Sequence, residues 1–149
     1  MHMHHKDSIA DAACACTALR KASRALSGVY DAALADTGMT IAQFSILRHI
    51  WRGGQVPLSR LAEQLVMDRT SLYRALTPLE RHEWVSIAPA PEGRTRIASL
   101  TDAGHAAMLR ATEPWEAAQT RILGEFGVDD WQALETMLRT LTAIAGDAR

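Results

Sequence analysis

The chain has 149 residues, a formal net charge of −1 and a hydrophobic fraction of 48%, values that are ordinary for one globular domain. Its apolar runs are too short to span a membrane, and its N-terminus lacks the uninterrupted apolar stretch of a secretory signal peptide. We therefore expect a single soluble, cytoplasmic domain. Sixteen basic residues against seventeen acidic ones exclude a histone-like protein that holds DNA by bulk positive charge. A local basic face would still permit site-specific binding.

The first half of the chain predicts four helices. Apolar side chains recur three, four or seven positions apart, as amphipathic helices require. Thr40 is placed to cap the second helix and Gly53-Gly54 to end it, while Asp68 is placed to cap the fourth. The predicted helices cover residues 8–35, 41–51, 58–65 and 69–81.

The hydrophobic period changes in the second half. Alternating apolar residues on both sides of a turn-forming segment from Pro89 to Gly93 predict a β-hairpin. Thr101 then begins a long helix, which Pro114 should kink or interrupt. The expected strands cover 85–88 and 95–100, and the expected helices cover 102–126 and 128–145. The fold class is therefore mainly α (α+β), with six helices and a hairpin inserted after the fourth.

The third and fourth helices meet at Val66-Met67, across a turn of the size found in helix-turn-helix motifs. The outer side of the fourth helix carries arginine and threonine side chains. Arginine guanidinium groups can bind guanine through two hydrogen bonds, and threonine can contact base edges, so this side suits the major groove of DNA. The hairpin carries Arg94 and Arg96, and a narrow basic ribbon of this kind suits a minor groove. The inner side of the fourth helix consists of Leu72, Leu76 and Leu79, and its outer side of Arg69, Thr70, Tyr73, Arg74, Thr77 and Arg81.

A solvated surface is the alternative explanation for this polar helix side, because charged residues are mostly exposed in any protein. A helix that is merely solvated would not need an arginine-tipped hairpin beside it. The order of two short helices, a basic hairpin and a long helix therefore favours DNA binding.

The segment over 57–108, above all MDRTSLYRALTPLER and EGRTRIASLT, resembles the winged-helix core of the MarR family (multiple antibiotic resistance regulators). The flanking helices match the family in order and length, so the resemblance covers essentially the whole chain. The family pattern of an acidic residue, any residue, Arg, five residues, Leu-Thr and then Gly is met by Glu92, Arg94, Leu100, Thr101 and Gly104.

The resemblance implies a homodimeric transcriptional regulator, most often a repressor, that binds a pseudo-palindromic DNA operator. Within a single domain over 1–149, residues 1–37 and 102–149 would form the dimerisation helices. Residues 38–101 would form the winged helix-turn-helix lobe with its two-stranded wing. The recognition helix would enter a major groove and the wing a minor groove. The expected DNA-contacting residues are Ser59, Arg60, Arg69, Thr70, Tyr73, Arg74, Thr77, Arg94 and Arg96.

Three residues depart from the family pattern or from regular helix geometry. Val66 occupies a turn position where the family often has Gly, so some backbone strain is expected there. Glu92 stands where the family usually has Asp, which weakens its expected role in bracing the wing. Pro78 lies inside the recognition helix and should bend it locally.

Cys14 and Cys16 are the only cysteines, and both fall in the first predicted helix. Two residues apart on a helix they would point about 200° from each other and could not pair without unwinding it. Cys16 lies on the apolar stripe and is expected in the core, whereas Cys14 points elsewhere. Two interpretations stay open. The cysteines are small packing residues, or they form a possible redox sensor through an intermolecular disulfide of Cys14, since some family members sense oxidants in this way.

The family usually has a ligand cleft between the dimerisation helices and the winged-helix lobe. Tyr30, Arg48, Trp51 and Met108 are the residues expected to line it, with simple core packing as the alternative for Trp51 and Met108. One arginine beside an apolar wall would suit a small aromatic or phenolic effector.

No cofactor, metal or catalytic centre is expected. His2, His4 and His5 are closely spaced but lack Cys or carboxylate partners at metal-site intervals. No hydrolase motif or phosphate loop occurs, and a thiol oxidoreductase that uses Cys14 and Cys16 would need a Cys-x-x-Cys motif. A winged helix that binds protein instead of DNA is the other alternative, and its recognition face should be apolar.

Overall fold

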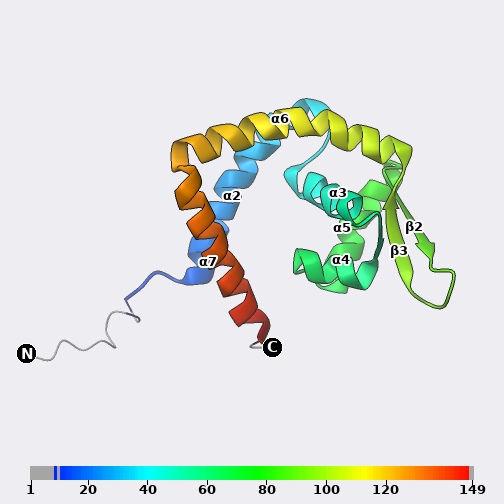
Figure 1. Ribbon diagram of the computed structural model, residues 1–149, viewed down its shortest axis with the longest axis horizontal. Coiled ribbons are helices and arrows are strands. Elements are labelled where there is room, and N and C mark those ends of the chain that lie inside the picture. The colour runs from blue at the N-terminus through cyan, green and yellow to red at the C-terminus, as the bar shows by residue number, and fades with distance from the viewer. Residues whose placement is uncertain (1–8, 10, 148–149) are drawn as a thin grey trace, which may run out of the picture.

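The computed structural model describes Ile9 and residues 11–147. Its helices are α2 (Ala15–Ala33), the short 3-10 helix η1 (Ala35–Thr37), α3 (Ile41–Gly53), α4 (Leu58–Leu65), α5 (Arg69–Arg81), α6 (Asp102–Phe126) and α7 (Val128–Asp147), and its strands are β1 (Gln55–Pro57), β2 (Val85–Pro89) and β3 (Arg96–Leu100). The long helix α6 links two parts of the molecule (Figure 1). A lobe of α3, α4, α5 and the strands lies below its first half, and α7 descends from its far end beside α2.

Three helix starts follow the sequence prediction. The Thr40 hydroxyl accepts a hydrogen bond from the N–H of Gln43 at 3.2 Å, and the Gln43 side chain accepts one from the N–H of Thr40 at 3.0 Å. Asp68 accepts a hydrogen bond from the N–H of Ser71 at 2.8 Å, and Thr101 caps α6 through its hydroxyl. These side chains satisfy backbone groups that have no partner within the helix and so fix where α3, α5 and α6 begin.

The predicted hairpin is confirmed as β2 and β3, an antiparallel pair in which Val85 lies opposite Leu100 and Pro89 opposite Arg96. The structure adds a third strand, because β1 pairs antiparallel with β3 and gives the sheet order β1-β3-β2. Sequence periodicity could not show β1. A strand of three residues has no alternation to detect, and it forms only where β3 lies beside it.

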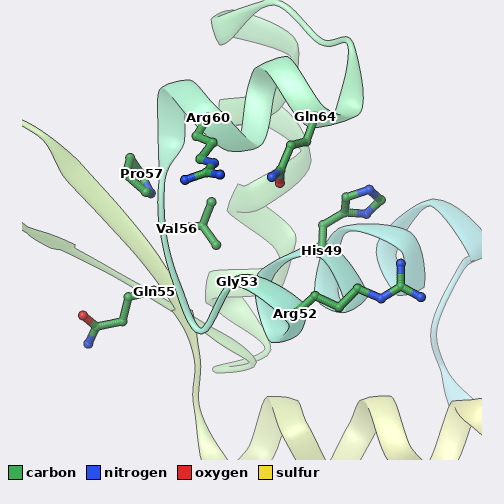
Figure 2. Close-up of a pocket in the computed structure, with 8 residues that line it drawn as sticks. All are labelled: His49, Arg52, Gly53, Gln55, Val56, Pro57, Arg60 and Gln64. Carbon is green, nitrogen blue, oxygen red and sulfur yellow. The ribbon is translucent and has the colours of Figure 1, made fainter. Parts of the chain in front are cut away.

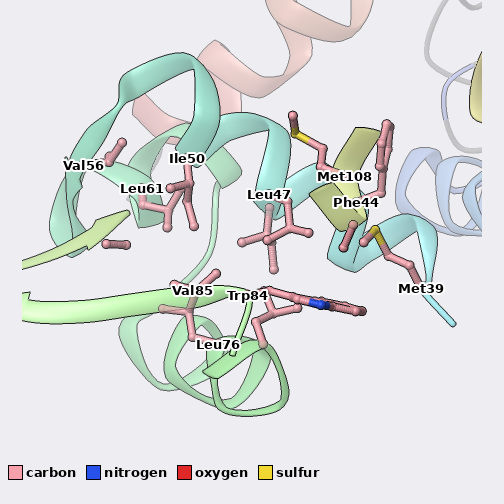
Figure 3. Close-up of a cluster of buried hydrophobic side chains, with 14 of the residues drawn as sticks. Met39, Phe44, Leu47, Ile50, Val56, Leu61, Leu76, Trp84, Val85 and Met108 are labelled. Atoms are coloured by element: carbon pink, nitrogen blue, oxygen red, sulfur yellow. The ribbon is translucent and has the colours of Figure 1, made fainter. Parts of the chain in front are cut away.

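The hydrophobic core lies within the lobe and reaches the first half of α6 (Figure 3). Leu47 of α3, Leu61 of α4, Leu76 of α5 and Ala98 of β3 all have no exposed surface. The apolar sides predicted for α4 and α5 are therefore confirmed. The buried members of those two sides are Leu58, Leu61, Ala62, Leu72, Leu76 and Leu79, while Leu65 is half-buried.

Helices α2 and α7 have no buried residue in the single chain. Part of the apolar stripe predicted for the first helix is consequently exposed, with Leu19 at 42% and Leu26 at 40%, whereas Leu34 at its end is buried. Helix α7 likewise exposes Met137, Leu141 and Ile144. Among the described residues, no helix is long and apolar enough to cross a membrane.

The extent predicted for the first helix is wrong, and of the kink or interruption predicted at Pro114 the interruption is wrong. Helix α2 begins at Ala15, because the described residues 11–14 are turn and irregular backbone, although Ile9 before them is helical. Ile9 is 76% exposed, so its side chain provides no packing that would extend α2 back to it. Pro114 does not interrupt α6, which continues to Phe126, since contacts with α2 and α3 hold the long helix in place.

Candidate nucleic-acid interface

The turn between α4 and α5 depends on a left-handed residue. Val66 has φ 54° and ψ 44°, and the N–H of Met67 donates to the carbonyl of Ala62 at 2.9 Å, which closes the end of α4. A residue with a Cβ adopts this conformation at a cost of about 1–2 kcal/mol. The strain expected from valine in place of glycine is therefore present in the backbone.

Helix α5 divides its side chains as the sequence predicts. Leu72, Leu76 and Leu79 are at most 2% exposed and face the core. The helix starts at Asp68, whose pKa is lowered because its carboxylate accepts hydrogen bonds from the backbone amide and then the hydroxyl of Ser71. All nine residues predicted to contact DNA are exposed: Ser59, Arg60, Arg69, Thr70, Tyr73, Arg74, Thr77, Arg94 and Arg96.

Five of these nine residues line one cleft, which we call the helix–wing cleft. It has a volume of about 340 Å³ and is bounded by Leu58, Ser59, Arg69, Tyr73, Arg94, Thr95 and Arg96. Residues from the start of α4, the first turns of α5 and the hairpin, far apart in sequence, thus surround one hollow. Three guanidinium groups and no carboxylate line it, so the cleft is electropositive and suits a phosphate group.

Thr95 is a lining residue that the sequence analysis missed. The sequence analysis began the second strand of the hairpin at residue 95. In a strand, successive side chains point to opposite faces, so the side chain of Thr95 would point away from those of Arg94 and Arg96. Strand β3 begins only at Arg96, so Thr95 belongs to the irregular tip and is not bound by that alternation.

The other four predicted residues lie outside the helix–wing cleft. Thr70, Arg74 and Thr77 are exposed along α5, and Arg60 lines a separate cavity. The Thr77 hydroxyl donates a hydrogen bond to the carbonyl of Tyr73 at 2.9 Å. Because its hydroxyl proton is used in that bond, Thr77 can accept a hydrogen bond from an external partner but cannot donate one.

The base of the wing is joined to the start of α6 by hydrogen bonds. The Thr101 hydroxyl donates to the carbonyl of Glu83 at 2.5 Å, and the N–H of Thr101 donates to the carbonyl of Trp84 at 3.1 Å. The family signature residue Thr101 therefore ties the segment after α5 to α6. Glu92 is exposed in the hairpin loop, and its bracing role stays a prediction.

The predicted effector cleft is only partly as expected. Tyr30 and Arg48 line a cavity of about 210 Å³ between α2, α3 and α6, together with Trp115. Trp51 and Met108 do not line it. Trp51 is 52% exposed and stacks on His105, whereas Met108 is buried in the core. The sequence could not assign Trp115 to the cavity, because its position depends on where α6 crosses α3.

Arg48 is held over two aromatic rings in this cavity. Its guanidinium carbon lies 4.3 Å from the ring centre of Trp115 and 5.6 Å from that of Phe44. Burial, together with the charge of Arg52, lowers the pKa of Arg48. The Tyr30 hydroxyl donates to the side-chain carbonyl of Gln119 on the same rim, and burial raises the pKa of Tyr30.

Cys16 differs from its predicted environment, whereas Cys14 is exposed but differs from its predicted helical conformation. Cys14 lies just before α2 with φ −57° and ψ 121°, so it is not helical, and the expected 200° separation on a helix is wrong. Cys16 is exposed and not in the core, because α2 packs no side chain into the lobe at this level. The backbone amide and the hydroxyl of Thr17, followed by the backbone amide of Cys16, lower the pKa of the Cys14 thiol.

The N-terminal histidines His2, His4 and His5 lie outside the described residues. Within the described part of the chain, no three His, Cys, Asp or Glu residues gather closely enough to hold a metal ion.

Comparisons with known proteins agree with this architecture. A model of the MarR family matches residues 39–94, which include the helix-turn-helix and the first strand of the wing. A crystal structure of the Mycobacterium tuberculosis transcriptional regulator MosR in complex with DNA is 31% identical, with a TM-score of 0.84 over 92% of this chain and 99% of that one. No curated protein matches the chain.

Two further structures show the same fold. The repressor CouR bound to a 23-mer DNA duplex is 24% identical, with a TM-score of 0.78 over 95% of this chain and 99% of that one. A mutant of MarR from Escherichia coli, complexed with operator DNA, is 20% identical, with a TM-score of 0.76 over 84% of this chain and 91% of that one. The winged lobe, the flanking helices and the near-complete coverage of MosR establish that this chain belongs to the MarR family of winged-helix transcriptional regulators.

Proposed function

We propose that the protein is a dimeric, sequence-specific DNA-binding repressor that acts in the cytoplasm. The observation that carries this proposal is the helix–wing cleft, where Arg69, Arg94 and Arg96 converge from two elements with no carboxylate among the lining residues. A duplex laid along α5 would place its backbone at this cleft. Phosphate contacts there would set the register, while Thr70 and Arg74 farther out on α5 would read base edges.

Exposed apolar side chains on α2 and α7 support a dimer. An apolar groove of about 490 Å³ lies between the first turns of α2 and the last turns of α7 and is bordered by Leu19 and Leu141. Ile144 is 61% exposed on the same end of α7. Contiguous apolar surface of this kind marks an interaction site. We propose that residues 1–37 and 102–149 form the dimerisation region, which holds two recognition helices about one DNA turn (~34 Å) apart.

Selection from random duplexes at physiological salt tests this function. The reduced protein should enrich a pseudo-palindrome that it binds with a Kd on the order of 10⁻⁸ M or tighter. Arg69→Ala should weaken binding because it removes one arginine of the helix–wing cleft, whereas Arg52→Ala, a change at an exposed arginine of α3 that does not line this cleft, should not. Sequence-blind binding that vanishes with salt would contradict the proposal and favour a winged helix that contacts protein.

A small aromatic or phenolic acid is the effector that the cavity at Arg48 favours. Its aromatic walls, Phe44 and Trp115, suit a ring, and the guanidinium suits a carboxylate. Because the cavity lies where α2 and α6 meet α3, an occupant would change the angle between the lobe and the dimerisation helices. Saturable release of DNA by salicylate, lost in Arg48→Gln, would support this effector class, and unchanged DNA affinity would remove it.

The exposed Cys14 favours oxidation as a second signal that releases the protein from DNA. Cys14 is exposed and its thiol has a lowered pKa, and both features increase thiolate reactivity. We propose an intermolecular Cys14 disulfide near the dimer groove, and assign Cys14 and Cys16 no enzymatic role. Mild peroxide should reduce DNA affinity in the wild type and leave Cys14→Ser unaffected. Equal responses of the two proteins would contradict the redox role.

A further inference from the structure

A second basic site lies on the flank of the lobe, between the end of α3, strand β1 and helix α4 (Figure 2). We call it the basic cavity. Its volume is about 590 Å³, which is within the range of small-molecule sites. Its lining residues are His49, Arg52, Gly53, Gln55, Val56, Pro57, Arg60 and Gln64.

The lining is rich in donors for an anion. Arg52 and Arg60 contribute guanidinium groups, Gln55 and Gln64 contribute amides, and no carboxylate is present. His49 has its Nδ1 atom 2.7 Å from a backbone carbonyl, which can only accept, so Nδ1 carries the proton and the Nε2 lone pair can accept a hydrogen bond from an O–H group of a ligand. An anion would therefore find two cations whose charge no lining side chain offsets.

These groups come from opposite walls. In Figure 2, Arg60 and Gln64 extend from α4 toward α3, and His49 rises from α3 toward α4. Arg52 lies one turn after His49 along the rim of α3 and also borders the cavity at Arg48. Gln55 points away from the other side chains in this view. A ligand seated between the walls would thus bridge α3 and α4.

Arg60 links the basic cavity to DNA binding. It is exposed near the start of α4, next to Ser59, which lines the helix–wing cleft. His49 and Arg52 belong instead to the last turns of α3 and line no part of that cleft. One end of the basic cavity therefore belongs to the DNA-facing surface, while its other end is formed by residues outside the proposed interface.

We propose that the basic cavity is an effector site for a small molecule that carries a phosphate or carboxylate group, and that this molecule competes with DNA for Arg60. The competition rests on the proposed function, whereas the anion site itself does not. An occupant that pairs with Arg60 removes a phosphate contact from DNA and fixes α4 against α3. Neither effect requires a ligand in the cavity beside Arg48.

Isothermal titration calorimetry without DNA tests the site directly. Pyrophosphate and citrate serve as the phosphate and carboxylate probes, at an ionic strength held constant with sodium chloride. At least one probe should bind saturably, and Arg52→Gln should weaken its binding about tenfold or more, as expected for the loss of a hydrogen bond to a charged group. Arg110→Gln, an exposed arginine of α6, is the matched control and should leave binding unchanged. Circular dichroism checks that each variant is folded.

A competition experiment on the selected operator tests the link to DNA. The bound probe should raise the operator Kd of the wild type, and the effect should fall about tenfold in Arg52→Gln, in line with its weaker probe binding. Without the probe, Arg52→Gln should bind the operator like the wild type.

Three results would overturn the proposal. These are no saturable binding of either probe, an equal loss of probe binding in Arg110→Gln, or a loss of operator affinity in Arg52→Gln as large as in Arg60→Gln. The last result would make the cavity part of the DNA surface. If the wild type bound the probe through Arg52 but bound no DNA, the anion site would stand, and the competition would fall with the proposed function.

Discussion

A Cβ atom on Gly104 would lie 1.9 Å from the carbonyl oxygen of Trp84. The first turn of α6 therefore packs directly on the backbone that leads from the recognition helix into the wing. The hydrogen bonds from Thr101 to the carbonyls of Glu83 and Trp84 reinforce the same junction. The angle between the lobe and α6 is set here, which gives the Thr and Gly of the family signature a structural role.

Gly104→Ala should destabilise the protein. The new methyl group meets backbone atoms, which cannot move aside as a flexible side chain can, so overpacking should cost about 1–3 kcal/mol. Gly124→Ala, in the same helix but with open space around the added atom, should instead stabilise it by up to about 1 kcal/mol. Urea unfolding of both variants measures the difference. A Gly104→Ala protein as stable as the wild type would show that the junction is not tightly packed.

Val66→Gly should raise stability. It relieves about 1–2 kcal/mol of left-handed strain and loses about 0.5–1 kcal/mol through the greater freedom of the unfolded chain. Val66 is 61% exposed, so little apolar burial is lost. The net gain in the free energy of unfolding, measured with urea, should be up to about 1.5 kcal/mol. Val66→Ala retains a Cβ and is the control, since it should not show this gain.

Arg94→Ala and Arg74→Ala should weaken DNA binding in different ways. Arg94 lines the helix–wing cleft, so its loss should reduce affinity for all sequences by a similar factor and make the dependence on salt less steep. Arg74 is exposed on α5, and its loss should change which operator sequence binds best, with a cost of about 1–3 kcal/mol at one base pair. Binding to a panel of single-base operator variants separates the two. Equal losses on every sequence would remove Arg74 from base readout.

Stability should depend on pH through Asp68. Its pKa is lowered in the folded state by the amide and hydroxyl of Ser71, so the charged form is favoured by folding. The contribution is therefore complete above the unfolded pKa, near about 4, and is lost as pH falls through the lower folded value. Asp68→Asn retains a capping oxygen that does not titrate in this range. The stability of the wild type relative to Asp68→Asn should be constant at neutral pH and should fall in acid. A constant difference down to pH ~2 would contradict the shift.

Local features of the chain were predictable where short-range chemistry decides them. The caps at Thr40, Asp68 and Thr101 need only a side-chain oxygen next to the first helical turn, and the apolar side of α5 needs only its leucine spacing. The hairpin followed from alternation around turn residues. The same local logic failed at Cys14, where good helix formers had no packed surface to stabilise a helix.

Apart from η1 and β1, the sequence by itself determined the order of the elements and the polar and apolar sides of the recognition helix, because these depend on periodicity. Its motifs also resembled those of the family. Only the tertiary structure decided which residues share a site. It brought Ser59 to Arg94 across the helix–wing cleft, placed Trp115 and not Trp51 at the cavity beside Arg48, and set His49 opposite Arg60. These neighbours come from separate elements, and their positions depend on how α4, α5 and α6 pack on one core, which no local pattern encodes.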